Sequence, residues 1–155
     1  MLLFIVISVV VVLLLGSIVV YNGLIRLRNQ VADSWAGIVI QLVRRADLVP
    51  NLVNVVRGYK VHERETLDSV TRARAAAQSA AGPAEASEAA KQLQGSLVSL
   101  MAVAEAYPEL KADASFRELQ EQLATLEEDI SFARRFYNSL VRKYNTLQQT
   151  FPASL

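Results

Sequence analysis

The chain has 155 residues, of which 52% are hydrophobic and 20% charged, with a net charge of +1, one histidine and no cysteine. The lack of cysteine excludes a disulfide scaffold, a thiolate metal site and a cysteine nucleophile. The balanced charge argues against a nucleic-acid partner, because proteins that bind nucleic acids usually carry a marked basic excess. The length suits one domain.

The chain begins with an apolar run that is long enough to cross a bilayer. Residues 2–20 contain no charge, and as a helix rising ~1.5 Å per residue they extend ~28 Å, close to the hydrocarbon thickness. Tyr21 follows, and its ring suits the membrane interface. A cleaved signal peptide fits less well, because a basic start and a small-residue cleavage site are missing. We expect residues 1–21 to be a retained anchor in the lipid bilayer.

Basic residues follow this run and none precedes it. The first are Arg26 and Arg28, and Arg44 and Arg45 come later. By the positive-inside rule, the N-terminus lies outside and the C-terminal domain lies in the cytoplasm. We therefore expect a single-pass protein of the cytoplasmic membrane.

Residues 22–155 carry helical rather than strand periodicity. Apolar residues recur at steps of four and three from Val31 to Tyr59, with Arg45 out of pattern. Asp47 can cap a new helix, and Pro50 is tolerated in a first turn but costs ~3 kcal/mol in a helix interior. The pattern predicts one helix over about 22–45 and a second over about 48–80.

The second half of the chain predicts two further helices. Ala81-Gly82-Pro83 is a turn signal, Pro108 stops the third helix, and the capping-box pattern from Ser115 to Glu118 opens the fourth. The fourth helix has ten apolar or aromatic positions at steps of four and three: Leu119, Leu123, Leu126, Ile130, Ala133, Tyr137, Leu140, Tyr144, Leu147 and Phe151. This seam predicts close helix packing, as in bundles and coiled coils.

Ordered motifs cover nearly all of the chain after the apolar run. They are Tyr21-Asn22-x-Leu24, Leu27-Arg28-Asn29, Trp35, Gln41-Leu42-x-Arg44-Arg45-x-Asp47-Leu48-x-Pro50-Asn51-Leu52-Val53, Gly58-Tyr59-x-x-His62-Glu63, Glu105-x-Tyr107-Pro108-x-Leu110-Lys111, Arg134-x-x-Tyr137-Asn138-x-x-Val141-x-x-Tyr144-Asn145 and Phe151-Pro152. In these motifs the chain resembles the LemA family of bacterial membrane-anchored proteins, which includes a magnetosome protein. The resemblance implies an all-α fold, with an N-terminal transmembrane helix followed by an up-and-down antiparallel four-helix bundle over residues 22–155. It implies no established enzymatic activity.

Metal chemistry is disfavoured by the single histidine. His62-Glu63 looks like the start of a zinc-protease HExxH motif, but Thr66 stands where the second histidine is needed. A di-iron bundle needs paired Glu-x-x-His motifs, which the chain lacks. We expect no metal, no cofactor and no catalytic residue, and we interpret His62 as a polar contact at a helix face or turn.

The densest charge cluster is Arg44, Arg45 and Asp47. Because Arg45 falls on the apolar stripe, it either reaches out to solvent at the bundle end or pairs with an acid. A sharper alternative is an anion site at the N-terminus of the second helix, where backbone N–H groups and two guanidiniums would converge.

Tyr137-Asn138 and Tyr144-Asn145 repeat at seven residues, which places the tyrosines in the seam and the asparagines beside it. Polar groups in a seam usually fix helix register, and Arg134, Glu127 and Glu105 are candidate partners. The alternative is an enclosed polar pocket for a small ligand.

Charge is divided unevenly between the halves of the chain. Residues 22–80 carry nine basic and five acidic side chains, and residues 81–155 carry seven basic and ten acidic ones. Such surfaces attract each other and can orient an assembly of copies.

These features favour a non-catalytic scaffold that self-associates as a homo-oligomer or recruits membrane proteins, with membrane organisation as the first variant to test. The alternatives are an adaptor or regulator of a membrane enzyme such as a protease, and a small-ligand sensor.

Overall fold

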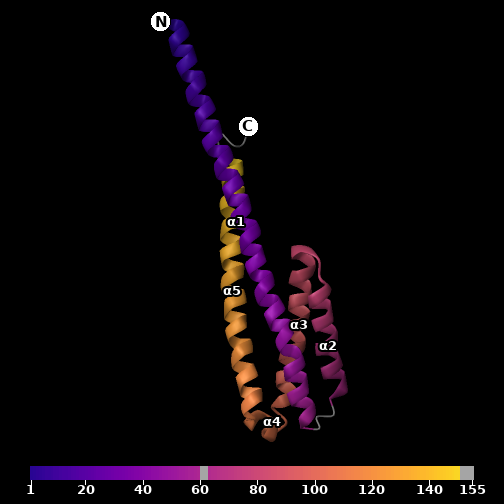
Figure 1. Cartoon of the computed structure of the whole chain (residues 1–155). Coiled ribbons are helices and arrows are strands. Elements are labelled where there is room, and N and C mark those ends of the chain that lie inside the picture. The colour runs from indigo at the N-terminus through magenta and orange to yellow at the C-terminus, as the bar shows by residue number, and fades with distance from the viewer. Residues whose placement is uncertain (60–62, 151–155) are drawn as a thin grey trace. The chain divides into compact units, whose positions relative to one another are not determined.

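The computed structural model describes residues 1–59 and 63–150, and within these ranges the chain forms five helices and no strand. The helices are α1 (Leu2–Gly58), α2 (Arg64–Ser79), α3 (Gly82–Ala104), α4 (Pro108–Ala112) and α5 (Ala114–Gln149) (Figure 1). The predicted all-α class is confirmed.

The helices form two compact units. The anchor unit comprises Met1–Ala36 and Ala133–Leu155, and the core unit comprises Gly37–Phe132. Helices α1 and α5 contribute residues to both units because each is long, with 57 and 36 residues.

Helix α1 includes the apolar run and continues without a break to Gly58. Among the described residues it is the one helix long and apolar enough to cross a membrane, and the apolar window is not buried by the rest of the chain. The structure is therefore consistent with a candidate membrane span at the N-terminus.

The predicted break between residues 45 and 48 is wrong, because Arg45 belongs to the apolar stripe rather than interrupting it. The positions at steps of four and three along α1 are all buried or half-buried: Val31, Trp35, Ile38, Leu42, Arg45, Val49, Leu52, Val56 and Tyr59. The 3.5-residue repeat is thus unbroken, and packing along it favours one continuous helix. The second predicted helix shrinks to α2, which begins at Arg64.

Pro50 lies inside α1 rather than in a first turn. A proline lacks the N–H that would bind the carbonyl four residues earlier, which here is Ala46. The Nε of Arg74 on α2 donates to the Ala46 carbonyl oxygen at 3.0 Å. A side chain from the neighbouring helix therefore supplies a donor that the proline cannot.

Helices α2 and α3 lie side by side within the core unit (Figure 1). The predicted turn between them is confirmed, since α2 ends at Ser79 and α3 begins at Gly82. Gly82 has a φ of 79°, a left-handed conformation that residues with a Cβ adopt only at a cost. Glu85 follows, and its Oε2 accepts from the Ala81 N–H at 3.0 Å.

The start of α5 differs from the capping box predicted at Ser115. Helix α5 begins at Ala114, and its cap is Asp113, whose Oδ1 accepts from the Phe116 N–H at 2.9 Å. Pro108 does more than stop a helix, because it opens the short helix α4. The capping carboxylate lies two residues earlier than predicted, and Ser115 is exposed within the first turn.

The predicted seam of α5 is confirmed at its nine described positions, from Leu119 to Leu147, which are all buried or half-buried. Phe151 lies outside the described residues. In the core unit, helix α5 contributes Phe116 and the seam residue Leu119 to an apolar cluster drawn from all five helices. Its buried members are Ala46, Val49, Leu52, Val53, Val56, Leu67, Val70, Ala73, Leu93, Leu97, Leu100, Ala104, Leu110, Phe116 and Leu119.

The contact between Arg74 and the Ala46 carbonyl should depend on Pro50. Arg74→Met should lower the free energy of unfolding by about 1 kcal/mol in the wild-type chain, because a carbonyl loses its side-chain donor. In Pro50→Ala the new N–H serves that carbonyl, so Arg74→Met should cost less than half as much. Denaturant unfolding of the wild type, Arg74→Met, Pro50→Ala and the double variant in mild detergent, followed by circular dichroism, measures this coupling. Arg72→Met, at an exposed neighbour, is the control, and equal costs in both backgrounds would contradict the compensation.

A buried arginine as the candidate functional site

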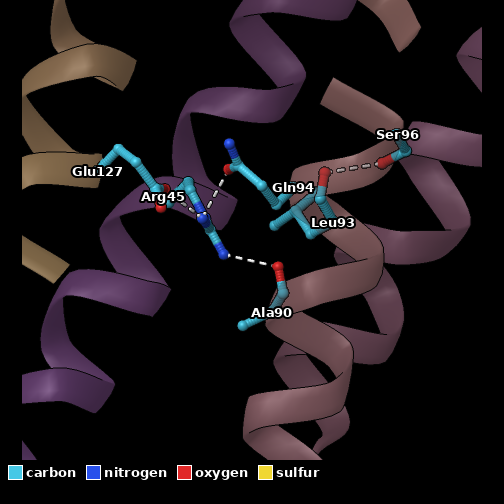
Figure 2. A network of polar contacts seen from close by, with 6 residues as sticks. All are labelled: Arg45, Ala90, Leu93, Gln94, Ser96 and Glu127. Carbon is cyan, nitrogen blue, oxygen red and sulfur yellow. Dashed lines mark hydrogen bonds and ion pairs between the residues drawn. The ribbon is translucent and has the colours of Figure 1, made fainter. Parts of the chain in front are cut away.

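Arg45, which is 2% exposed, forms hydrogen bonds to two other helices of the core unit through its buried side chain. Its Nη1 donates to Gln94 Oε1 at 2.9 Å and to Glu127 Oε2 at 2.8 Å, and its Nη2 donates to the Ala90 carbonyl oxygen at 2.8 Å (Figure 2). The guanidinium therefore links α1 to α3 and to α5.

The helical repeat explains why Arg45 points at these partners. It takes a seam position on α1, so its side chain is directed at the neighbouring helices rather than at solvent. Ala90 is buried and has a small side chain, which lets the guanidinium reach the backbone of α3. A helical carbonyl has two lone pairs and can accept this second donor. Six residues further along α3, Ser96 donates to the Leu93 carbonyl oxygen at 2.9 Å, which satisfies its buried hydroxyl (Figure 2).

The two charges of the ion pair have different surroundings. The Arg45 side chain is 3% exposed, whereas that of Glu127 is 44% exposed. Burying a charge is costly unless it is paired and hydrogen-bonded, so Arg45 depends on all three acceptors, while Glu127 stays solvated. Of the two alternatives that the sequence left open for Arg45, pairing with an acid is the observed one.

The anion site predicted at residues 44–47 has lost its basis. It required a helix N-terminus at Asp47, but Asp47 lies in the interior of α1, where backbone N–H groups are used within the helix. Arg44 and Asp47 are both exposed and line an open groove of about 650 Å³. The wall of this groove on α5 carries three carboxylates, those of Glu118, Glu121 and Asp129.

A second groove, of about 370 Å³, lies between α3 and α5 beside the buried arginine. Its lining is mainly apolar, with Leu97, Met101 and Leu123, and Arg45, Gln94 and Glu127 also contribute. Glu127 was predicted as a hydrogen-bond partner of the seam tyrosines, and Gln94 was not among the predicted residues. A lone arginine on an apolar stripe was the available signal, because such a charge requires an acid from another helix.

A second polar contact joins the end of α1 to the start of α5 in the core unit. The Tyr59 hydroxyl donates to Asp113 Oδ2 at 2.7 Å. This hydrogen bond, with burial and the charges of Asp113 and Glu109, raises the pKa of Tyr59. The same bond, with the Phe116 N–H, lowers the pKa of Asp113. The sequence motifs included Tyr59 but gave no sign of its partner, because the two residues are 54 positions apart.

Two motif residues lie near this contact. Tyr107 and Pro108 line a cavity of about 300 Å³ together with Tyr59. Glu105, at the end of α3, forms an ion pair with Lys111 of α4, and both side chains are exposed. Glu105 was predicted as a partner of the seam tyrosines and instead serves this local turn. Glu63 is exposed just before α2, and His62 lies outside the described residues.

The tyrosine repeat of α5 falls in the anchor unit. Tyr137 packs edge-on against Trp35 of α1, with ring centroids 5.7 Å apart and an interplanar angle of 60°. Such edge-to-face pairs contribute about 0.5–1.5 kcal/mol beyond their area. Tyr144 is half-buried, as the seam predicts, and Asn138 and Asn145 are exposed beside it. Arg134 is half-buried on the same helix.

No group of three or more histidine, cysteine, aspartate or glutamate side chains is placed to hold a metal ion within residues 1–59 and 63–150. His62 is not among these residues, so the prediction that the chain binds no metal stays a prediction.

These observations define an all-helical protein with an N-terminal candidate membrane helix and a buried arginine that joins its packed helices. The chain belongs to the LemA family, whose family model matches residues 34–155. The match begins after the apolar run and includes Trp35, Arg45, Glu127 and the tyrosine repeat. A comparison with curated proteins found no match.

Removal of Arg45 should cost far more than neutralisation of Glu127. Arg45→Ala should lower the free energy of unfolding by about 3 kcal/mol or more, because it leaves acceptors and a void inside the core unit. Glu127→Gln should cost about 1 kcal/mol, because the buried guanidinium loses its counter-charge but keeps an acceptor in the amide oxygen. Denaturant unfolding in mild detergent measures both.

Arg44→Met is the matched control for Arg45, since Arg44 is exposed, and it should change stability by less than about 0.5 kcal/mol. Arg45→Met fills the volume and should cost less than Arg45→Ala. Equal losses for Arg44→Met and Arg45→Ala would refute the structural role of the buried guanidinium.

The bond between Tyr59 and Asp113 should make stability depend on pH at both extremes. The lowered pKa of Asp113 contributes stability that is present above its ordinary value of 3.8 and is lost as pH falls through the folded pKa. The raised pKa of Tyr59 contributes stability that is present below 10.0 and is lost as pH rises through the folded pKa. Tyr59→Phe should therefore have a lower free energy of unfolding than the wild type at intermediate pH. The difference between the two proteins should shrink at acidic pH and again at strongly basic pH. Unfolding series across pH, with Tyr21→Phe as the matched control, test this, and parallel profiles for wild type and Tyr59→Phe would count against it.

Proposed function

We propose that this protein is a non-catalytic scaffold of the bacterial cytoplasmic membrane that acts by self-association. The apolar start of α1 is the anchor, and the C-terminal domain lies in the cytoplasm as the up-and-down four-helix bundle that the family resemblance implies. The support is the apolar run, the positive charges that follow it, and membership of the LemA family.

The observation that carries the proposal is a set of large apolar side chains exposed outside the packing seams. Phe132 is 66% exposed and Phe136, one turn further along α5, is 51% exposed. On α1, Val39, Ile40 and Val43 are each more than one-third exposed. Clustered apolar side chains on a surface mark interaction sites, because leaving them in water is unfavourable.

The internal polar contacts support a structural rather than a catalytic role. Arg45 is bonded to Glu127, Tyr59 to Asp113, and Glu105 to Lys111. These side chains hold helices and turns to one another, so their charges and hydroxyls serve packing.

We infer that the occupant of the apolar faces is a second copy of the chain. A shared membrane holds copies in one orientation and raises their effective concentration, so a modest apolar contact suffices for association. Each copy presents the phenylalanines on α5 and the aliphatic side chains on α1. Assembly in the membrane plane would suit membrane organisation, the variant suggested by the family resemblance.

Replacement of both phenylalanines should weaken association without unfolding the protein. Burying two such side chains contributes about 3 kcal/mol, which is roughly a hundredfold in the dissociation constant. We expect the full chain in lipid nanodiscs to form oligomers, and Phe132→Ser/Phe136→Ser to be mostly monomeric at the same density. Cross-linking and single-molecule photobleaching measure the distribution of oligomers.

Val98→Ser, at an apolar side chain of α3 that is 59% exposed, is the control and should leave the distribution unchanged. A wild-type chain that is monomeric at every density and captures no membrane protein would overturn the scaffold. A monomer that instead co-purifies with a membrane enzyme, and whose loss changes that enzyme's activity, would favour the adaptor.

A further inference from the structure

In the anchor unit, the part of α1 that follows the apolar run and the C-terminal part of α5 are antiparallel helical segments (Figure 1). A Cβ placed on Gly23 would lie 3.7 Å from Leu147 Cδ2, and Trp35 contacts Tyr137. From the first contact to the second, the residue number increases along α1, from 23 to 35, and decreases along α5, from 147 to 137, so the two segments are antiparallel. The C-terminal end of α5 therefore lies beside the residues that immediately follow the apolar run.

An open groove of about 570 Å³ lies between these segments. Leu27 of α1 and Leu147 of α5 supply apolar surface, and the remaining lining residues are polar or basic: Ser139, Arg142, Lys143, Thr146 and Thr150. The Ser139 hydroxyl donates to the Phe136 carbonyl and that of Thr150 to the Leu147 carbonyl, so their oxygens remain able to accept. The groove thus combines two cations, hydroxyl acceptors and an apolar wall.

One end of this groove falls in the headgroup layer of a bilayer. The apolar run ends at Val20; Gly23, which faces Leu147 of the groove, follows it by three residues, and Leu27, which lines the groove, by seven. At ~1.5 Å per residue these lie ~4 and ~10 Å beyond the run, so the groove begins among the polar headgroups and extends past them, away from the hydrocarbon.

Charge is strongly concentrated in this unit. The anchor unit holds six basic side chains and one acidic side chain, Asp33, a net +5, and its part of α5 contains no acid at all. The core unit holds ten basic and fourteen acidic side chains, a net −4. The net charge of the whole chain is near zero because the unit that contains the candidate span is cationic and the core unit is acidic.

We propose that the groove formed by Leu27, Ser139, Arg142, Lys143, Thr146, Leu147 and Thr150 binds the headgroup of an anionic phospholipid. Arg142 and Lys143 bind the phosphate, the hydroxyl oxygens accept from headgroup hydroxyls, and Leu147, at the end of the groove nearer the apolar run, contacts the glycerol. Basic residues close to a membrane surface are attracted to anionic lipids in this way. The inference rests on the proposed function in one respect, that residues 2–20 span the membrane.

The test uses the full chain in mild detergent and native mass spectrometry with phosphatidylglycerol or phosphatidylcholine as the probe. The wild type should retain more phosphatidylglycerol than phosphatidylcholine. Arg142→Gln/Lys143→Gln should bind it about thirtyfold more weakly, because two attractive charges are lost, with helix content unchanged by circular dichroism. Arg57→Gln/Arg72→Gln removes the same charge from exposed positions of the core unit and should bind like the wild type.

The other outcomes each overturn the inference. Equal losses in both double variants would mean attraction to overall charge rather than binding in this groove. Displacement of the lipid by inorganic phosphate would mean a free-phosphate site. Insertion into neutral phosphatidylcholine vesicles, measured by flotation, reports on the anchor separately. A chain that inserts but shows no preference for phosphatidylglycerol refutes the lipid site alone, and a chain that does not insert refutes the anchor itself.

Discussion

A guanidinium at a buried position must be given hydrogen-bond acceptors, and the core unit is arranged around that requirement. Arg45 occupies a position where α1 would otherwise carry an apolar side chain, and its three acceptors come from α3 and α5. An apolar residue at this position could pack in several registers, because hydrophobic contacts are not directional. Hydrogen bonds are directional, so the arginine selects one register of α1 against its neighbours.

The same helix contains a second departure from ideal helix chemistry a few residues later. Pro50 deprives the Ala46 carbonyl of its usual donor, and Arg74 of α2 donates to that carbonyl. Two arginines thus connect α1 to α2, α3 and α5 through groups that an idealised helix would not offer. The contact of Arg74 compensates for the donor that α1 lacks at Pro50, so the helix continues through the proline.

The distribution of charge separates the two units by chemistry. The anchor unit combines the apolar run with a basic excess, and the core unit has an acidic excess and most of the exposed apolar side chains proposed for self-association, with Phe136 of the anchor unit as the exception. A basic excess suits contact with anionic headgroups, and exposed apolar side chains suit contact with protein. The proposed lipid site and the proposed self-association therefore draw on different residues and different forces.

The sequence by itself determined the elements whose cause is local. The apolar run, the turn at Gly82, the seam of α5 and the all-α class follow from composition, backbone preference and periodicity over short stretches. It also sufficed for the family, because the motifs are contiguous. The break between residues 45 and 48 was mispredicted because local rules count an arginine on an apolar stripe and a proline at residue 50 as interruptions. Only the tertiary structure decided that α1 continues, since Gln94, Glu127 and Arg74, which satisfy those two positions, come from distant parts of the chain. The partnership of Tyr59 with Asp113 was hidden for the same reason: which distant side chains meet depends on how the helices pack, and periodicity within one helix carries no information about its neighbours.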